Sequence, residues 1–179
     1  MWKTSSIRTL AAVAATVATT AVVSLTVASA DASNNDWQTI RVAGDGNCLF
    51  RAVAQGAAVR SGQLLLSSHA EGEAAAALRK QSMDELVKRR EECEWFIEGD
   101  FETYVARMRT SHTWGGEPEI LMMTHVLKSP ITVVEAASQQ AIAEYGQEYS
   151  DDSKPIISIL FHQAGHYEAL VLLTPRSKL

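Results

Sequence analysis

Cys48 stands where a cysteine can act as a nucleophile. It follows a turn over residues 44–47, rich in residues that tolerate positive φ, and it opens an apolar segment, 48–54, predicted as a buried helix. The positive end of a helix dipole stabilises a thiolate, and free N–H groups of the turn could hold an oxyanion when the sulfur attacks a carbonyl. The alternative is an ordinary turn and helix with a buried cysteine that packs as a small hydrophobe.

A nucleophilic cysteine needs a base, and one histidine has a distinctive setting. Gly165 precedes His166 and a predicted strand follows, so that the alternation of a strand puts His166 and Glu168 on one face and Tyr167 on the other. A carboxylate beside an imidazole fixes its tautomer and stabilises the imidazolium. One short strand could therefore present a base and its orienting group, unless it is an exposed edge with polar residues. The other four histidines are His69, His112, His125 and His162.

The four remaining histidines give weaker signals. His125 lies in an apolar helix and is interpreted as a packing histidine, while His162 follows a strand. A metal site competes for these side chains, but the chain has no Cys-x₂-Cys spacing, and one pair, His162 and His166, has the His-x₃-His spacing of zinc sites. His162 and His166 are four residues apart, yet the turn at Gly165 breaks the helical face that this spacing requires. We therefore expect no metal.

The surrounding pattern predicts helices first and strands later. Met83, Leu86 and Val87 form an apolar stripe in a segment rich in strong helix formers, and Pro118 suits the first turn of a later helix. This order indicates an α+β domain with a small, mainly antiparallel sheet packed by helices. The predicted helices span residues 70–94, 101–108 and 119–128, and the predicted strands span residues 37–42, 131–134, 141–145, 156–161 and 167–173.

Three segments in order resemble the OTU (ovarian tumour domain) family of cysteine proteases. Residues 44–52 (GDGNCLFRA) are similar to its cysteine box, residues 114–119 (WGGEPE) to its middle motif, and residues 165–168 (GHYE) to its histidine box. The resemblance covers residues 37–174, and residues 89–130 are most similar to plant members. It implies a papain-like cysteine protease fold.

The resemblance also implies roles for individual residues. Cys48 is expected as the nucleophile, His166 as the general base, and Asp45 as the acidic residue that shapes the oxyanion loop. The family usually has Asp or Asn two residues after the histidine, and this chain has Glu168 there, whose side chain is one methylene longer. Either Glu168 orients His166 or another group does. The expected substrate-binding residues are Gly46, Asn47, Trp114, Gly115 and Gly116; Trp114 is otherwise a core-packing residue.

The implied activity is a thiol-dependent deubiquitinase that hydrolyses isopeptide bonds at the ubiquitin C-terminus. The expected partner is ubiquitin or polyubiquitin, and no cofactor is required. Two alternatives are a ubiquitin-binding module without catalysis and a Cys-His acyltransferase, for which the sequence shows no pantetheine or nucleotide site. The net charge of −5 argues against a nonspecific nucleic-acid binder, and the two cysteines cannot form a disulfide scaffold. We expect a monomer.

Residues 1–30 differ in composition from the rest. They contain Lys3, Arg8 and no acidic residue, and a 21-residue apolar run extends from Leu10 to Ala30. A secretory signal, a transit peptide, a membrane anchor and a flexible tail are all compatible with this leader. After it, 21 acidic and 14 basic side chains give a net charge of −7. Because export or import would separate the domain from cytosolic ubiquitin, we expect a cytoplasmic protein with an atypical leader.

Overall fold

The structure, a computed structural model, describes residues 37–172. The leader over residues 1–30 and the end of the predicted domain, residues 173–174, lie outside the described residues. The helices are α1 (Cys48–Arg60), α2 (Ser68–Lys88), α3 (Arg90–Cys93), α4 (Phe101–Met108) and α5 (Glu117–Leu127), with short 3₁₀ turns η1 (Glu94–Phe96) and η2 (Gln147–Tyr149). The strands are β1 (Trp37–Ile40), β2 (Ile131–Glu135), β3 (Ala141–Tyr145), β4 (Ile157–His162) and β5 (His166–Leu172).

The five strands form one sheet in the order β1-β5-β4-β2-β3. The pairs β1–β5, β4–β5 and β2–β3 are antiparallel, and β2–β4 is parallel. The α+β class and the mainly antiparallel sheet are therefore confirmed. Among residues 37–172, no helix has the length and hydrophobicity needed to cross a membrane.

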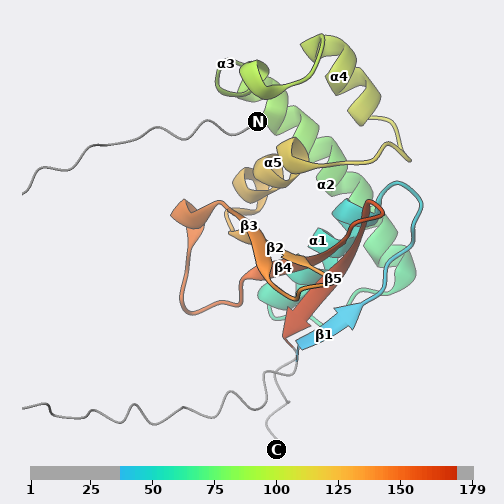
Figure 1. Cartoon of the computed structure of the whole chain (residues 1–179), viewed down its shortest axis with the longest axis vertical. Helices are drawn as coiled ribbons and strands as arrows, with labels where there is room; N and C mark the ends of the chain where they lie inside the picture. The colour runs from blue at the N-terminus through green and yellow to red at the C-terminus, as the bar shows by residue number, and fades with distance from the viewer. Residues whose placement is uncertain (1–36, 173–179) are drawn as a thin grey trace, which may run out of the picture. The chain divides into compact units, whose positions relative to one another are not determined.

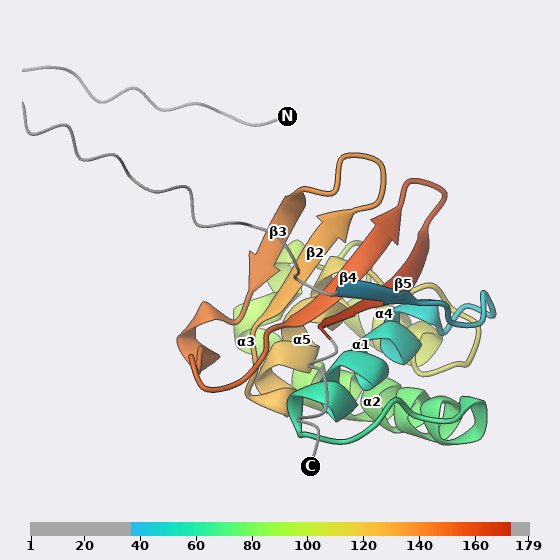
Figure 2. The ribbon, with the colours of Figure 1, turned by 90° about the horizontal axis from the view of Figure 1, so that it is seen from below.

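Helix α1 lies between the sheet and α2, as Figure 2 shows. It packs on β4 and β5 and contributes Leu49, Phe50 and Val53 to the main core. Gly56 permits this close approach, because a Cβ there would lie 2.8 Å from Cγ2 of Ile157 on β4. The apolar helix predicted over residues 48–54 thus continues to Arg60 against the sheet.

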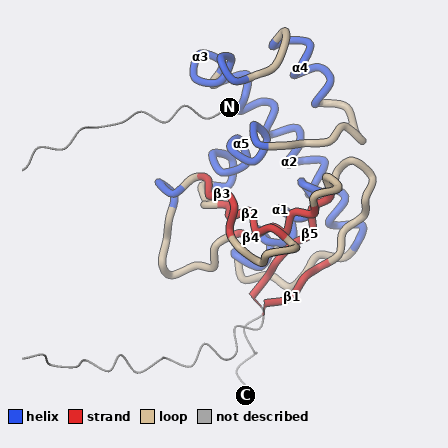
Figure 3. The backbone as a smooth tube through the Cα atoms, in the orientation of Figure 1, coloured by secondary structure: helices blue, strands red, loops and turns tan. Residues whose placement is uncertain are grey.

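A second core cluster packs the helices at the end of the domain that lies away from the sheet (Figure 1). The predicted helix over residues 70–94 is divided at Arg89, whose φ and ψ of −101° and 23° leave the helical range, into α2 and α3. Met83, Leu86, Phe101 and Met122 meet there and join α2, α4 and α5. The long connection over residues 109–116 then returns from α4 to α5, and Figure 3 shows it as loop.

Candidate active site

Cys48 is the first residue of α1 and is 7 % exposed. No acidic residue lies in the first turn of α1, and the side chain of Asn47 does not cap the helix. The free N–H groups at the N-terminus of α1 therefore donate no hydrogen bond to the side chain of the N-cap residue. This is the position expected for a thiolate stabilised by the positive end of a helix.

Arg51 of α1 holds the carboxylate of Asp45. Arg51 Nη2 lies 2.7 Å from Asp45 Oδ2, and its Nη1 bonds Glu71 on α2 at 3.1 Å. The backbone N–H of Asn47 also donates to Asp45 Oδ1 at 3.0 Å. The Arg51 guanidinium lowers the pKa of Asp45 from 3.8 to about 2. Asp45 therefore fixes the loop shape before Cys48 through hydrogen bonds with its own loop and helix.

Arg79 on α2 clamps the loop before Cys48 to the loop before α5. Its Nη2 donates to the carbonyl of Gly46 at 2.9 Å, to Oδ1 of Asn47 at 2.9 Å and to the carbonyl of Thr113 at 2.7 Å. Its Nη1 donates to the carbonyl of Met108 at 3.0 Å. The side chain is only 4 % exposed, and burial lowers its pKa from the ordinary arginine value.

The loop over residues 109–116 touches the cysteine box at two glycines. Gly46 has φ of 83°, and a Cβ on it would overlap the backbone of His112. His112 Nδ1 lies 2.6 Å from the carbonyl oxygen of Asp45. A Cβ on Gly115 would lie 2.9 Å from Cδ2 of Leu49. The two loops therefore fit together only because both positions lack a side chain.

Trp114 is exposed over 68 % of its surface, so the core-packing alternative is wrong. Its ring lies against Gly165, where a Cβ would be 2.7 Å from Cζ3 of the indole. Gly165 has φ of 83° and closes the hairpin between β4 and β5 by donating its N–H to the carbonyl of His162 at 2.8 Å. A three-residue hairpin with glycine in the left-handed region is a common connection. The middle motif thus reaches the turn that precedes His166.

His166 lies beside the cysteine box. A Cβ on Gly44 would lie 3.8 Å from both Nδ1 and Cε1 of His166, so this edge of the imidazole faces the loop that leads to Cys48. The neighbouring Tyr167 is on the other face of β5 and packs against the main core. The predicted alternation along this strand is confirmed, since Ala169 and Val171 are also in that core.

Glu168 shares the face of His166, but its hydrogen bond goes to a different histidine. Glu168 Oε2 lies 3.0 Å from Nε2 of His162, the last residue of β4. His162 and His166 are directly opposite each other in the β4–β5 register, with ring centroids 5.9 Å apart. The structure therefore shows no Glu168–His166 hydrogen bond in the described residues, and it gives Glu168 a partner that the sequence did not suggest.

Gly116 precedes α5 and is bound by the buried Glu119. The N–H of Gly116 donates to Glu119 Oε2 at 2.7 Å, and the Tyr104 hydroxyl donates to Oε1 at 2.7 Å. Burial raises the pKa of Glu119, which is 1 % exposed, although both hydrogen bonds oppose this shift. In the described part of the chain, no residue other than its chain neighbours has a heavy atom within 4 Å of a Cβ placed on Gly116, so this glycine faces open space.

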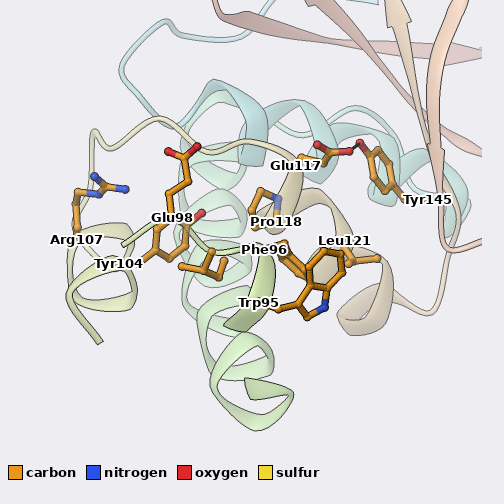
Figure 4. A pocket seen from close by; sticks show the side chains of 10 residues that line it. Trp95, Phe96, Glu98, Tyr104, Arg107, Glu117, Pro118, Leu121 and Tyr145 are labelled. Atoms are coloured by element: carbon orange, nitrogen blue, oxygen red, sulfur yellow. Dashed lines mark hydrogen bonds between the residues drawn. The ribbon is translucent and has the colours of Figure 1, made fainter. Parts of the chain in front are cut away.

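A pocket of about 570 Å³ opens at the end of the middle motif, between the segment from η1 to α4 and the start of α5 (Figure 4). Trp95, 83 % exposed, and Leu121 supply apolar surface, and Tyr145 donates its hydroxyl hydrogen to Glu117 at 2.7 Å. Glu117 directly follows Gly116, so the pocket begins where the loop of the middle motif ends. None of the site residues expected from the sequence lines it.

Sequence reasoning missed Arg79 and His112, and it did not connect His162 with Glu168. Arg79 lies in a stretch of strong helix formers where a charged residue suggests a solvated face.

His125 is a packing histidine, with its Nδ1 2.8 Å from the Tyr149 hydroxyl. Within residues 37–172, no three His, Cys, Asp or Glu side chains are grouped to hold a metal ion.

Known proteins share both the sequence pattern and this fold. A family model described as OTU-like cysteine protease matches residues 43–167. The OVARIAN TUMOR DOMAIN-containing deubiquitinating enzyme 4 of Arabidopsis thaliana is 48 % identical over 153 residues, which are 80 % of this chain and 48 % of that protein. Deubiquitinase OTUD6B of Xenopus laevis is 26 % identical over 142 residues, covering 74 % of this chain and 44 % of that protein. The chain thus spans about half the length of these relatives, or less.

Solved structures show the same fold. The OTUD1 OTU domain matches with a TM-score of 0.59 at 23 % identity, covering 75 % of this chain and 85 % of that one. An OTU domain solved in complex with ubiquitin matches with a TM-score of 0.58 at 22 % identity, covering 75 % of this chain and 69 % of that one.

Proposed function

Because the chain belongs to the OTU-like cysteine protease family, we propose that it is a deubiquitinase that uses Cys48 and His166. One observation carries the proposal: three segments far apart in sequence converge around the N-terminus of α1. Gly44 of the cysteine box faces His166, and Trp114 of the middle motif covers Gly165. Arg79 joins the cysteine box to the loop over residues 109–116 by hydrogen bonds to Gly46 and Thr113. The relatives named as deubiquitinating enzymes support the choice of substrate.

The first half of the reaction forms a thioester. The Cys48 thiolate attacks the carbonyl carbon of the bond between the ubiquitin C-terminal glycine and a lysine. Backbone N–H groups of the loop over residues 45–48 hold the oxyanion of the tetrahedral intermediate. His166, as imidazolium, then donates its proton to the lysine nitrogen as the C–N bond breaks, and the lysine amine leaves.

The second half releases ubiquitin. Neutral His166 takes a proton from water, whose oxygen attacks the thioester carbon. The C–S bond breaks, the thiolate returns, and ubiquitin leaves with a free carboxylate. The oxyanion and the departing thiolate both form at the N-terminus of α1, where the helix dipole has its positive end.

The loop over residues 109–116 is proposed to hold the ubiquitin tail. Trp114 stands exposed over Gly165, and Gly116 leaves open space beside it, as a narrow channel for a Gly-Gly end requires. The pocket with Trp95 and Leu121 starts one residue later and offers apolar surface for the body of the modifier. Trp95→Ala should therefore raise KM for a ubiquitin substrate without lowering kcat, whereas an unchanged KM would place the modifier elsewhere.

The decisive experiment uses the full chain and ubiquitin with a C-terminal electrophile. A covalent adduct should form with the unmutated protein and with Cys93→Ala, and it should be absent with Cys48→Ala. Cys93 is the matched control, because it is also a free and buried cysteine, 2 % exposed, in the second core cluster. An adduct that survives Cys48→Ala, or none with the unmutated protein, would contradict the proposal.

The same experiment separates the alternatives. A ubiquitin-binding module would bind ubiquitin but form no adduct, and an acyltransferase would depend on an acyl donor such as acyl-CoA. Turnover of a ubiquitin isopeptide substrate without added cofactor would be inconsistent with both.

Cytoplasmic localisation remains a proposal that rests on the need to reach cytosolic ubiquitin. A fluorescent fusion expressed with and without residues 1–30 tests it. The same diffuse cytosolic signal from both is expected, and a change of compartment on removal of these residues would assign them a targeting role.

A further inference from the structure

We propose that His162 is a positioning residue that acts on His166 through Glu168. This inference rests on the proposed function, because it concerns how the histidine of that reaction is oriented. It starts from the hydrogen bond of 3.0 Å between His162 Nε2 and Glu168 Oε2. That bond gives the carboxylate beside His166 a fixed partner that the family motif alone does not supply.

The sheet register brings the three side chains to one face. His162 is directly opposite His166, and Leu160 is opposite Glu168, so Glu168 is the diagonal neighbour of His162. Diagonal neighbours in an antiparallel pair lie about 7–8 Å apart at Cα, which long side chains bridge. The extra methylene of Glu168, compared with Asp or Asn, allows its carboxylate to reach across to β4.

The two oxygens of the Glu168 carboxylate differ in their contacts. Oε2 is used by His162, and no hydrogen bond to Oε1 occurs within residues 37–172. The Nδ1 edge of His166 faces Gly44 and the cysteine box, which leaves Nε2 as the nitrogen available to an orienting group. An ionised carboxylate accepts hydrogen bonds at both oxygens, so Glu168 can bridge the two imidazoles without releasing His162.

Burial makes this bridge effective. The Glu168 side chain is 14 % exposed and that of His162 is 38 % exposed, so the carboxylate is the more buried of the two partners. A flexible Glu side chain loses rotamer freedom when it is fixed, and His162 imposes that restriction before substrate binds. The carboxylate that would orient His166 is thereby held in place before substrate binds.

The variants that test this are His162→Phe, His162→Gln, Glu168→Gln and the double variant His162→Phe/Glu168→Gln, made in the full chain. Phe keeps a ring but has no donor, while Gln restores an N–H near the position of Nε2. Gln163→Ala is the matched control, because Gln163 follows His162 in the same hairpin and bonds Glu135 instead of Glu168. Melting temperatures are measured for all variants to confirm that each is folded.

Two readouts are used, and only one of them depends on ubiquitin. The first is kcat and KM for ubiquitin with a fluorogenic C-terminal amide. The second is the rate at which iodoacetamide alkylates Cys48, followed by peptide mapping so that Cys93 is counted separately. Alkylation reports the thiolate, which an oriented His166 imidazolium stabilises.

His162→Phe should lower kcat about tenfold and leave KM unchanged, and His162→Gln should recover most of the loss, since a hydrogen bond to a charged group corresponds to about this factor. Alkylation of Cys48 should slow in His162→Phe and Glu168→Gln alike. The double variant should be no slower than the slower single variant, because both changes remove one interaction. Wild-type values of kcat and of the alkylation rate in His162→Phe would overturn the proposal.

Failure of the proposed function would look different. If the unmutated protein does not release the fluorophore, deubiquitinase activity is wrong, and the alkylation rates still decide whether His162 acts on the Cys48–His166 pair. Equal loss in Gln163→Ala and His162→Phe would also overturn the proposal, since it would indicate a general disturbance of the hairpin.

Discussion

Replacing Arg79 with Met should separate the two loops that this residue holds. The guanidinium makes hydrogen bonds to four acceptor atoms: the carbonyl oxygens of Gly46, Met108 and Thr113, and Oδ1 of Asn47. Met fills a similar apolar volume and stacks on Phe50, as the guanidinium does at 4.3 Å from the ring centroid. The change therefore tests the hydrogen bonds more than the packing.

The magnitude follows from the acceptors that lose their donor. Each hydrogen bond contributes about 1 kcal/mol net, and an acceptor left unpaired in a buried place costs about 1–3 kcal/mol. Burial of the guanidinium, which lowers the pKa of Arg79, offsets part of this. We expect the free energy of unfolding to fall by about 2–4 kcal/mol, which leaves a domain of about 5–15 kcal/mol still folded.

Urea unfolding followed by circular dichroism measures this loss, with Lys80→Met as the control. Lys80 is the next residue on α2, but its side chain is 73 % exposed and pairs with Asp84 at 2.8 Å, so its replacement should cost less than about 1 kcal/mol. Arg79→Lys should recover less than half of the loss, because one ammonium cannot reach acceptors in three directions. Under native conditions kcat should fall at least about tenfold, since the loop before Cys48 is no longer held in place. A loss of stability for Arg79→Met no greater than that of Lys80→Met would show that Arg79 does not hold the two loops together.

Two more changes test single contacts of the site. Asp45 has its pKa lowered to about 2 by Arg51, so its ionised form stabilises the fold above the ordinary value of 3.8, and this contribution is lost as pH falls through about 2. The stability difference between the wild type and Asp45→Asn, measured by urea unfolding between pH 2 and 6, should therefore shrink below about pH 4; a constant difference would contradict the assigned cause. Gly165→Ala should destabilise the protein by more than Gly62→Ala and should shift the fluorescence of Trp114. Both glycines have positive φ, 83° and 78°, but only a Cβ at Gly165 meets a ring, so equal losses would exclude the Trp114 contact as a cause.

The sequence predicted the elements well where the periodicity was strong. The strand over residues 141–145 and the helix over residues 101–108 have the bounds expected of them. The helix over residues 70–94 did not, because composition indicates helix on both sides of Arg89, while the backbone turns there to bring α3 and α4 over the second core. A change in direction that serves packing leaves no mark in a helix-forming composition.

The site shows a similar division between local and tertiary information. Cys48 at the start of α1 and the alternation at His166 depend on neighbours in sequence, and both could be read from it. Arg79 and His162 act on residues 33 and six positions away in sequence, through a helix contact and a strand register. Their role depends on distances that only the fold sets. A charged residue in a helix pattern is correctly expected at the surface unless a ring of acceptors surrounds it.

The glycines expected to bind substrate have two different physical reasons. Gly46 and Gly115 lie where a second segment touches the backbone, so the absence of a side chain serves the assembly of the site. Gly116 has open space beside it, while its N–H is held by Glu119. The packing of the loops therefore accounts for two of the three glycines without any ligand. The proposed channel for a ubiquitin tail depends most on Gly116, the one position where an added side chain would meet the substrate before it met the protein.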